Sequence, residues 1–480
     1  MPTGARRVLA MLCVLVTVGA IVALGSGTVR ALADTQPAVL QEAVDGWASE
    51  IGAPGMTVQI VDSDGVVAQA STGVDGRGAP VDDATPFVWG SVSKQLTAAT
   101  VRGLERDGFV DENARVVDVV PQARQILVDP AVTVGDLIFH TSGLPHDITG
   151  TDDWTRRESA ADAVATMYEP DGVAARGTFR YSSLNYLLLQ AVVEMATDGS
   201  FADALEREVL EPAGATTTIT DPEDFERSVP PGHVPFFGSA RSIDVGVDAA
   251  GLGYGYLAGS ISDLGRYAAW RLAELQNGES SMAEVDTGHG TTYGNGLFHE
   301  SIGGQDVWWH SGAVPGYYAY VAFVPGENVA MVLAANRYGE IEAERIAAVG
   351  RNVTTLVVDG STSDLPGSMA PIVLGVLLGA LALLIGWIVL SVYRVLTGRT
   401  KESSFAGAAI RVLIVVVGAG VTVIGVYVGV PMLVGATPTV MALWAPDVAV
   451  MFWVLLGAVC LTATLLVVSQ VVGYGKSRRH

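Results

Sequence analysis

The chain has 480 residues, half of them hydrophobic, and a net charge of −22. Between Asp34 and Gly367 lie 48 of the 50 acidic residues and 18 of the 28 basic residues, so this region carries a net charge of −30. A basic nucleic-acid-binding surface is therefore excluded. The acidic exterior has two alternative explanations. It could keep the domain soluble in salt or away from anionic lipid, or it could reflect a compositional bias of the genome. Cys13 and Cys460 both lie in apolar segments, so the acidic region holds neither disulfides nor thiolate metal sites.

The first 33 residues predict a secretory signal. Arg6 and Arg7 precede an apolar run from Val8 to Leu24, and Ala31-Leu32-Ala33 resembles an A-x-A cleavage site. Because this apolar run is long for a signal core, an uncleaved N-terminal anchor is the alternative interpretation.

Residues 34–360 predict one interleaved α/β domain. Strand-like alternation occurs near both of its ends, around a middle of helical patches broken by Gly and Pro from about residue 91 to 275. The expected elements are a helix at 38–51, a hairpin of strands at 56–61 and 66–70, strands at 306–311, 318–324 and 329–334, and a closing helix at 340–357. A sheet assembled from both ends of a segment implies one domain rather than several in a row.

Three apolar stretches follow a polar linker at 361–368. They cover residues 369–392, 412–434 and 448–472, and each has the approximately 20 residues that a bilayer-spanning helix needs. None contains an ionisable side chain. Arg411 and Asp447 lie just before the second and third stretches. The stretches therefore predict an anchor in the lipid bilayer rather than a transport pathway.

Basic residues predict the orientation of these helices. The first connection holds four of them and the C-terminal tail three, whereas the second connection, residues 435–447, has none: Arg394, Arg399, Lys401 and Arg411, then Lys476, Arg478 and Arg479. Basic loops remain cytoplasmic. We expect a multi-pass cell-membrane protein with a cytoplasmic C-terminus and residues 34–360 on the extracytoplasmic side.

The acidic region contains seventeen arginines but a single lysine, Lys94, three residues after Ser91. Arginine keeps its proton in proteins, whereas a lysine amine can be made neutral by burial or by neighbouring cations. A neutral amine can accept the proton of a weakly nucleophilic serine hydroxyl. Ser91 and Lys94 therefore predict a nucleophile and its base, against the alternative of a helix cap beside a solvated side chain.

Further polar segments could complete such a site. Tyr181, in a loop before a helix, offers a phenol that could move a proton if nearby cations lowered its pKa. His310 and Gly312 end a predicted strand, where a backbone N–H could complete an oxyanion hole. The polar turn at residues 139–145 suggests a structural role. Tyr181 and His310 could also be ordinary part-buried side chains.

Together these segments resemble the serine β-lactamase and penicillin-binding-protein-like hydrolases, in the branch of the class C enzymes and the D-Ala-D-Ala carboxypeptidases. Ser91-Val92-Ser93-Lys94 matches the first motif, Tyr181-Ser182-Ser183 stands in place of Tyr-x-Asn, and His310-Ser311-Gly312 stands in place of Lys-Thr-Gly or His-x-Gly. Residues 140–145, 259–264 and 315–317 match further segments. The resemblance spans most of residues 34–360 and implies an antiparallel sheet flanked by helices, with a mostly helical insertion.

The resemblance also implies a mechanism without a cofactor. Ser91 would form an acyl-enzyme on an amide or ester of a small-molecule or peptide-like substrate, with Lys94 and Tyr181 handling its proton. His310 would support the substrate, and the N–H groups of Ser91 and Ala313 would hold the oxyanion. Ser183 departs from the family asparagine, and a hydroxyl has only one proton to donate. Peptide-like and β-lactam substrates would then be held less well, which leaves esterase activity open.

Other classes of protein fit less well. No G-x-S-x-G motif occurs, which argues against an α/β-hydrolase esterase. There is no H-E-x-x-H motif, and the seven histidines are scattered, so no metal site is expected. A catalytically silent binding or sensing domain with the same fold remains the alternative, because Ser183 replaces a substrate-contacting residue. The sequence leaves the physiological substrate and the oligomeric state open.

Overall fold

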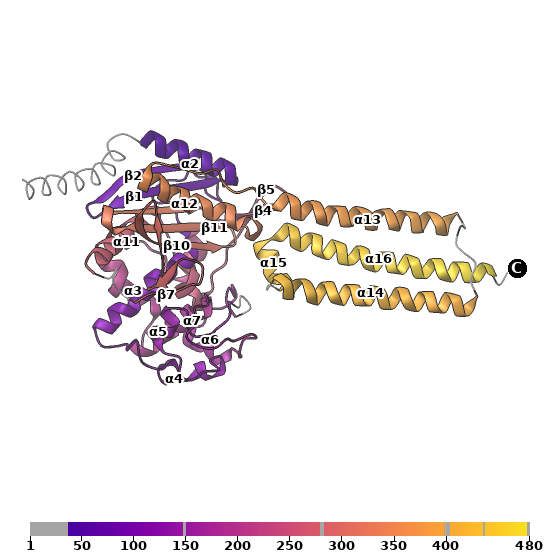
Figure 1. The fold of residues 1–480 in the computed structure, drawn as a ribbon, viewed down its shortest axis with the longest axis horizontal. Coiled ribbons are helices and arrows are strands. Elements are labelled where there is room, and N and C mark those ends of the chain that lie inside the picture. The colour runs from indigo at the N-terminus through magenta and orange to yellow at the C-terminus, as the bar shows by residue number, and fades with distance from the viewer. Residues whose placement is uncertain are drawn as a thin grey trace, which may run out of the picture. The chain divides into compact units, whose positions relative to one another are not determined.

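The computed structural model describes residues 37–146, 150–278, 283–397, 399, 404–434 and 437–477 (Figure 1). The predicted signal, residues 1–33, and the basic residues Lys401, Arg478 and Arg479 lie outside these ranges. The chain divides into two compact units. The sheet unit comprises the described residues up to His233, Ser242–Tyr338 and Ala343–Pro366, and the C-terminal unit comprises Val234–Arg241, Gly339–Glu342 and the described residues from Gly367 onward.

An eight-stranded antiparallel sheet forms the centre of the sheet unit, in the order β2-β1-β12-β11-β10-β9-β8-β7. The strands are β1 (Gly55–Asp62), β2 (Gly65–Gly73), β7 (Val285–Asp286), β8 (Thr292–Gly294), β9 (Leu297–Ile302), β10 (Gln305–Val314), β11 (Tyr317–Val324) and β12 (Val329–Ala335). Met56 of β1 pairs with Ala335 of β12, so the two ends of the unit meet in one sheet. This confirms the expected interleaved domain. The small strands β7, β8 and β9 were not predicted.

Helices cover both faces of this sheet. α2 (Pro37–Ile51) and α12 (Ala343–Asp359) lie on one face, and α11 (Ile261–Gln276) lies on the other (Figure 1). The apolar residues that predicted α2 are buried: Leu40, Val44, Trp47 and Ile51. α12 starts three residues later than predicted, because Glu340–Glu342 form a 3₁₀ turn before it.

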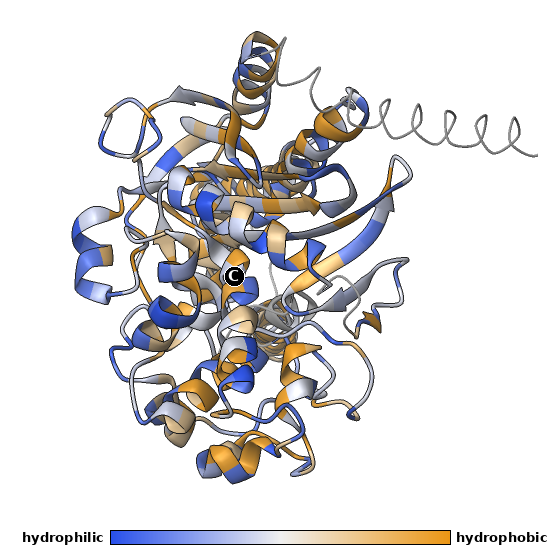
Figure 2. Ribbon diagram, turned by 90° about the vertical axis from the view of Figure 1, so that its left-hand side faces the viewer, coloured by the Kyte–Doolittle hydropathy of each residue, from blue (hydrophilic) through white to orange (hydrophobic). Residues whose placement is uncertain are grey.

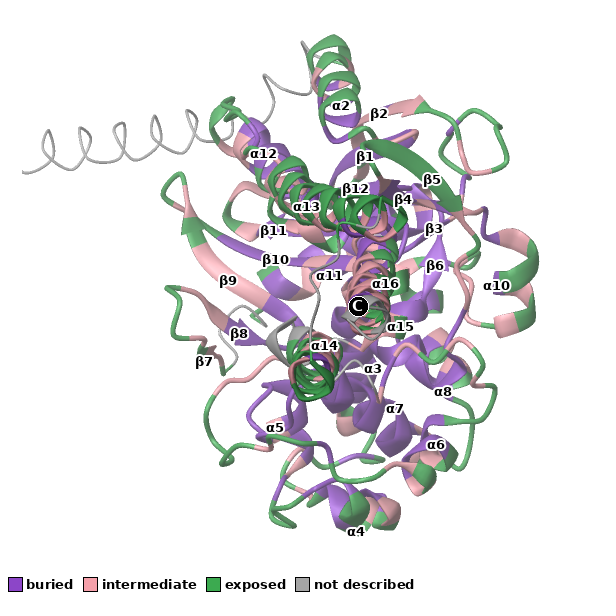
Figure 3. Ribbon diagram, turned by 90° about the vertical axis from the view of Figure 1, so that its right-hand side faces the viewer, coloured by how far each residue is buried: buried purple, intermediate pink, exposed green. Residues whose placement is uncertain are grey.

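The segment between β2 and α11 is mostly helical, as predicted. Its helices are α3 (Ser93–Arg106), α4 (Val116–Val119), α5 (Val134–Ile138), α6 (Ala160–Thr166), α7 (Ser183–Thr197), α8 (Phe201–Leu205), α9 (Glu211–Ala213) and α10 (Pro222–Ser228). Two strand pairs accompany them, β3 (Phe87–Val88) with β6 (Ala258–Gly259), and β4 (Gly232–Phe236) with β5 (Ser239–Ile243). α3 and α7 are almost wholly buried (Figure 3). Hydrophobic and hydrophilic residues are mixed along the ribbon (Figure 2).

The C-terminal unit contains the three predicted long helices, α13 (Ala370–Leu396), α14 (Phe405–Val434) and α16 (Pro446–Ser477). Each is long and apolar enough to cross a membrane. α16 packs against both of the others, and a short helix that was not predicted, α15 (Pro438–Trp444), precedes it. Apolar side chains of α13 and α14 are widely exposed (Figure 3).

The position predicted for Arg411 was wrong. α14 begins at Phe405, so Arg411 lies in its second turn rather than before the helix. Its guanidinium donates a hydrogen bond to Gln470 Oε1 of α16, 3.2 Å away. Backbone hydrogen bonding propagates a helix beyond its apolar stretch, so hydropathy alone placed this boundary too late.

Candidate active site

Strand β3 leads directly into the Ser91 turn. The Trp89 N–H donates to Leu257 O at 2.9 Å, and the Trp89 indole N–H donates to Gly259 O at 3.3 Å. Gly90–Val92 form a 3₁₀ turn that continues into α3. Gly90 has a φ of +54°, and a Cβ there would collide with Ala313 N. A glycine therefore lets the Ser91 turn approach β10 closely.

Lys94 is completely buried beside Ser91. Its Nζ lies 2.9 Å from Ser91 Oγ and 3.2 Å from Ser183 Oγ, and it donates to Tyr254 O at 2.8 Å. The hydroxyl of Ser183 thus contacts the lysine directly. Helix spacing places Ser91 and Lys94 on one face, whereas the other two partners come from segments 89 and 160 residues away.

Opposing effects set the protonation of Lys94. Burial lowers its pKa to about 7, and the negative charge of Asp152 acts in the opposite direction. The amine also lies over the rings of Tyr181, Tyr186 and Tyr254, at 5.1, 5.8 and 5.8 Å from their centroids. Ring faces attract an ammonium group and so keep the charged form accessible. Lys94 can therefore exchange a proton near neutral pH.

Tyr181 lies immediately before α7, as predicted, and faces the same site. Burial raises its pKa well above the usual value, although a hydrogen bond with Ser91 favours the ionised phenol. The condition considered for proton transfer, that nearby cations lower this pKa, is not met, because removal from water and the negative charge of Asp152 both raise the pKa. Tyr181 is therefore a protonated phenol in the free protein.

His140, from the turn predicted to be structural, supports Tyr181. It is fully buried at a φ of +56°, an uncommon conformation for a non-glycine residue. Its Nδ1 accepts the backbone N–H of Ser182 at 3.2 Å and lies 2.8 Å from Asn185 Nδ2. Its ring lies 4.6 Å from that of Tyr181. His140 thus holds the backbone beside Tyr181 in place.

The end of β10 forms the opposite side of the site. β9 pairs with β10 only as far as Trp309, so residues 310–314 pair with β11 alone within the sheet. A Cβ on Gly312 would collide with Trp89 O and lie 2.8 Å from Ser91 N, so this strand end lies directly against the Ser91 turn. The His310 ring lies 6.0 Å from the Tyr181 ring. All seven predicted site residues converge here: Ser91, Lys94, Tyr181, Ser183, His310, Gly312 and Ala313.

His310 is not a cation at neutral pH. Burial lowers its pKa to about 3, and the positive charge of Lys94 adds to this effect. Nδ1 lies 2.5 Å from Ser311 O, so Nδ1 carries the ring proton and Nε2 is an acceptor. The imidazole can accept a hydrogen bond, but it offers no positive charge to a substrate.

Sequence reasoning missed a second support behind the nucleophile. Leu252–Tyr256 form a turn of π-helix, a rare element that often occurs at functional sites. Its Tyr254 carbonyl accepts from Lys94, and its Gly253 carbonyl accepts from Thr97 Oγ1 at 2.7 Å. The Gly-Tyr-Gly-Tyr sequence at 253–256 was a detectable signal, although its meaning depends on the fold.

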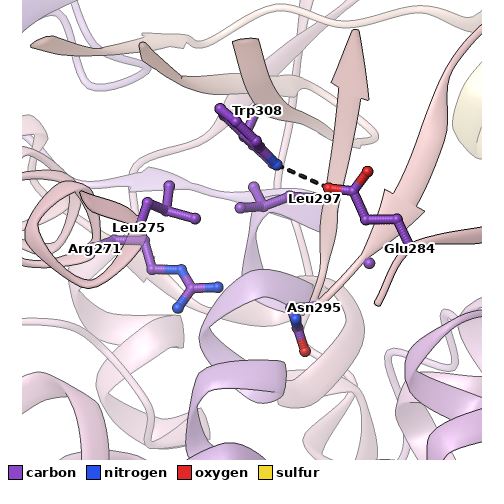
Figure 4. Close-up of a pocket in the computed structure, with 7 residues that line it drawn as sticks. Arg271, Leu275, Glu284, Asn295, Leu297 and Trp308 are labelled. Carbon is purple, nitrogen blue, oxygen red and sulfur yellow. Dashed lines mark hydrogen bonds between the residues drawn. The ribbon is translucent and has the colours of Figure 1, made fainter. Parts of the chain in front are cut away.

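A separate small pocket lies near β8 and β10 (Figure 4). It is lined by Arg271, Leu275, Glu284, Gly294, Asn295, Leu297 and Trp308. The Trp308 indole N–H donates to Glu284 at 2.9 Å. None of the predicted catalytic residues lines this pocket. Within the described residues, no group of three or more His, Cys, Asp or Glu side chains could hold a metal ion.

An antiparallel sheet, a helical insertion and a serine–lysine–tyrosine cluster between them define the class of active-serine hydrolases with the β-lactamase fold. The chain belongs to the beta-lactamase family, whose model matches residues 31–354.

Individual relatives agree with this assignment. Penicillin-binding protein 4 of Amycolatopsis lactamdurans is 29% identical over 327 residues, 62% of this chain and 84% of that protein. A D-aminopeptidase of Cereibacter sphaeroides is 25% identical over 63% of this chain, which spans only 61% of that enzyme. A solved class C β-lactamase has the same fold, with a TM-score of 0.54 and 18% identity over 69% of this chain and 99% of that one.

Proposed function

We propose that this protein is a membrane-anchored serine hydrolase that cleaves amide or ester bonds through an acyl-enzyme. The observation that carries this proposal is the buried amine of Lys94, 2.9 Å from Ser91 Oγ, with a pKa of about 7. A group with this pKa is near the optimum for a general base at neutral pH. Membership in the beta-lactamase family supports the same reaction class.

In the proposed mechanism, neutral Lys94 accepts the hydroxyl proton of Ser91 while Oγ bonds to the substrate carbonyl carbon. The N–H groups of Ser91 and Ala313 stabilise the oxyanion. Collapse of the intermediate breaks the bond to the leaving group, which takes its proton from Lys94 through the Tyr181 hydroxyl. Water then attacks the acyl-enzyme, gives one proton to Lys94 and releases the acid, and that proton returns to Ser91.

Three further groups keep this geometry in place. The Tyr254 carbonyl and Ser183 Oγ hold the amine, so that its lone pair can be directed at Ser91. His140 fixes the Tyr181 loop through the Ser182 N–H. We propose that neutral His310 accepts a hydrogen bond from the substrate.

An active-site probe tests this proposal directly. The full-length protein in detergent is incubated with a fluorophosphonate and with a fluorescent penicillin, and the adduct is located by mass spectrometry. We expect an adduct on Ser91 that is lost in Ser91→Ala and retained in the control Ser93→Ala. An unchanged label in Ser91→Ala would contradict the assignment. Absence of any label on the wild-type protein would instead favour a silent binding domain.

The anchoring part of the proposal rests on α13, α14 and α16. Their length and apolar surface suit a bilayer. The basic residues that flank the first and third helices predict an extracytoplasmic hydrolase domain and a cytoplasmic C-terminus. Protease added to intact spheroplasts should then digest the hydrolase domain and spare a C-terminal tag. Protection of the hydrolase domain would overturn this orientation.

A further inference from the structure

The β4–β5 hairpin, residues 232–243, is attached to the long C-terminal helices. Most of it belongs to the C-terminal unit. The Phe237 N–H donates to Asp447 Oδ2 at 3.2 Å, and Asp447 is the second residue of α16. A Cβ on Gly339 would collide with the Pro235 ring, and both residues line a small pocket with Ala370, the first residue of α13. The hairpin thus lies where two of the long helices begin.

Asp447 marks a polar boundary at the start of α16. The apolar span begins at Pro446, and no acidic or basic residue follows Asp447 before Lys476. Because a carboxylate is costly in the hydrocarbon core, the first turn of a bilayer-spanning α16 lies between lipid and water. Asp447 is only 3% exposed, since its Oδ1 accepts the Val448 N–H at 2.9 Å and its Oδ2 accepts from the hairpin. The turn of the hairpin therefore lies at the same level as this boundary.

The turn of the hairpin carries an aromatic residue in an unfavourable conformation. Phe237 and Gly238 connect β4 to β5 with φ values of +50° and +84°. Turns with positive φ at both positions favour Asn or Asp before Gly, and a bulky side chain is uncommon there. The Phe237 side chain is also 42% exposed, so packing within the chain covers only part of it. A strained and exposed aromatic residue indicates a contact beyond the chain itself.

The hairpin also differs in charge from the rest of the acidic region. That region carries a net charge of −30, yet residues 232–243 contain no acidic residue and one arginine, Arg241. The Arg241 guanidinium lies over the Phe236 ring, 4.9 Å from its centroid. The Phe236 and Phe237 rings meet edge to face with centroids 4.9 Å apart. This combination suits the edge of a bilayer, because aromatic rings can enter the acyl region while a guanidinium remains among the phosphates.

We propose that the β4–β5 hairpin contacts the surface of the lipid bilayer, with Phe237 inserted among the acyl chains near the headgroups and Arg241 beside lipid phosphate. Lipid is the occupant because the turn is hydrogen-bonded to the first turn of a helix that suits a bilayer. This inference rests on the proposed membrane anchoring and is independent of the acyl-enzyme chemistry. It gives the acidic region a lipid contact besides the three long helices.

Spin labels test this contact. The full-length protein with Cys13→Ser and Cys460→Ser receives one nitroxide at Ser239→Cys in β5, Leu383→Cys in α13 or Val66→Cys in β2, all exposed positions. Each protein is reconstituted into vesicles of phosphatidylcholine and phosphatidylglycerol. The measurement is the ratio of collision rates with oxygen, which dissolves in lipid, and with a water-soluble nickel chelate. We expect the ratio at Ser239 to be several-fold higher than at Val66, and the ratio at Leu383 to be the highest.

Phe237→Asn separates lipid contact from folding. Asparagine is favoured at positive φ, so the unfolding temperature in detergent should not fall. The ratio at Ser239 should nevertheless fall to the value at Val66, because the inserted ring is lost. Phe109→Asn is the matched control, since Phe109 is 55% exposed in the sheet unit, and it should leave the ratio at Ser239 unchanged.

The label at Leu383 distinguishes failure of this inference from failure of the anchoring proposal. With a high ratio at Leu383, a ratio at Ser239 that equals the Val66 value, or that Phe237→Asn does not change, overturns the hairpin contact and leaves the anchoring standing. Slow collisions with both reagents at Ser239 identify a covering protein surface and also overturn the lipid contact. A low ratio at Leu383 overturns the anchoring and the hairpin contact together.

Discussion

Helices α3 and α13 depart in opposite ways from the usual pattern of an apolar interior and a polar surface. α3 buries polar residues, Ser93, Lys94, Gln95, Thr97 and Thr100 among them, whereas α13 exposes apolar residues such as Leu383. In α3, the hydroxyl of Thr97 donates to Gly253 O, and the side-chain Oε1 of Gln95 accepts a hydrogen bond from the Tyr267 hydroxyl at 3.2 Å. Buried polar groups require such partners.

Each helix therefore reveals a different environment. The exposed apolar surface of α13 favours contact with lipid, because apolar side chains are unfavourable in water and favourable among lipid tails. Buried polar surface on α3 indicates chemistry, because removal from water is what brings the pKa of Lys94 to about 7.

Lys94→Arg should give the largest loss. Arginine keeps the positive charge but cannot accept the proton of Ser91, so acylation of Ser91 should slow by about a thousandfold. The rate constant for fluorophosphonate labelling measures this loss. Lys94→Met, which roughly preserves the apolar stem, is the folding control and should be equally inactive with a cooperative thermal transition. Substantial activity in Lys94→Arg would mean that the lysine acts only through its charge.

The pH dependence of kcat/KM should follow the protonation of Lys94. Protonation of Lys94 removes the base, so kcat/KM for a neutral ester should rise with pH through about 7 and level off above it. Well below that pKa, each pH unit should lower kcat/KM about tenfold, which gives a loss of about fiftyfold from pH 7 to pH 5. Rates corrected with Ser91→Ala as the blank provide the measurement. A profile without an inflection near pH 7 that still rises at the highest pH measured would instead identify Tyr181 as the base, because burial raises the pKa of Tyr181 well above the usual value.

An acidic substitution should distinguish an exposed apolar residue of a membrane helix from an exposed apolar residue of the sheet unit. Leu383 is 79% exposed on α13, and Val66 is 62% exposed on β2. Asp at the centre of a membrane helix costs about 3 kcal/mol of insertion free energy, whereas an exposed substitution in a water-soluble unit changes stability by about 0.5 kcal/mol or less. The yield of carbonate-resistant membrane protein should therefore fall in Leu383→Asp and not in Val66→Asp. Equal yields would argue against a bilayer around α13.

Ser183→Asn should give the smallest change. One hydrogen bond to a neutral group contributes about 0.5–1.5 kcal/mol, so restoring a side-chain amide should raise acylation by a penicillin several-fold to about tenfold. Ester hydrolysis should remain level. The measurement is the ratio of the second-order rate constants for a penicillin and an ester, before and after the substitution. A constant ratio would mean that Ser183 does not determine selectivity.

Local patterns were enough to predict several parts of the molecule. The spacing of Leu40, Val44, Trp47 and Ile51 predicted α2, and the alternation in residues 306–334 predicted β10, β11 and β12. These elements depend on periodicity, which neighbouring residues alone determine. β7, β8 and β9 were missed because short strands at a sheet edge carry little periodic signal.

The reactive residue types, their order along the chain, and the division between an acidic domain and apolar helices follow from the sequence alone. The electrostatics of the reactive residues depend on the tertiary structure. The phenol of Tyr181 keeps its proton and the imidazole of His310 is neutral, because burial raises the pKa of Tyr181 and lowers that of His310. Tyr254 and Asp152 reach Lys94 from 160 and 58 positions away in the chain. Contacts of that kind follow from how the segments pack, and no local pattern encodes them.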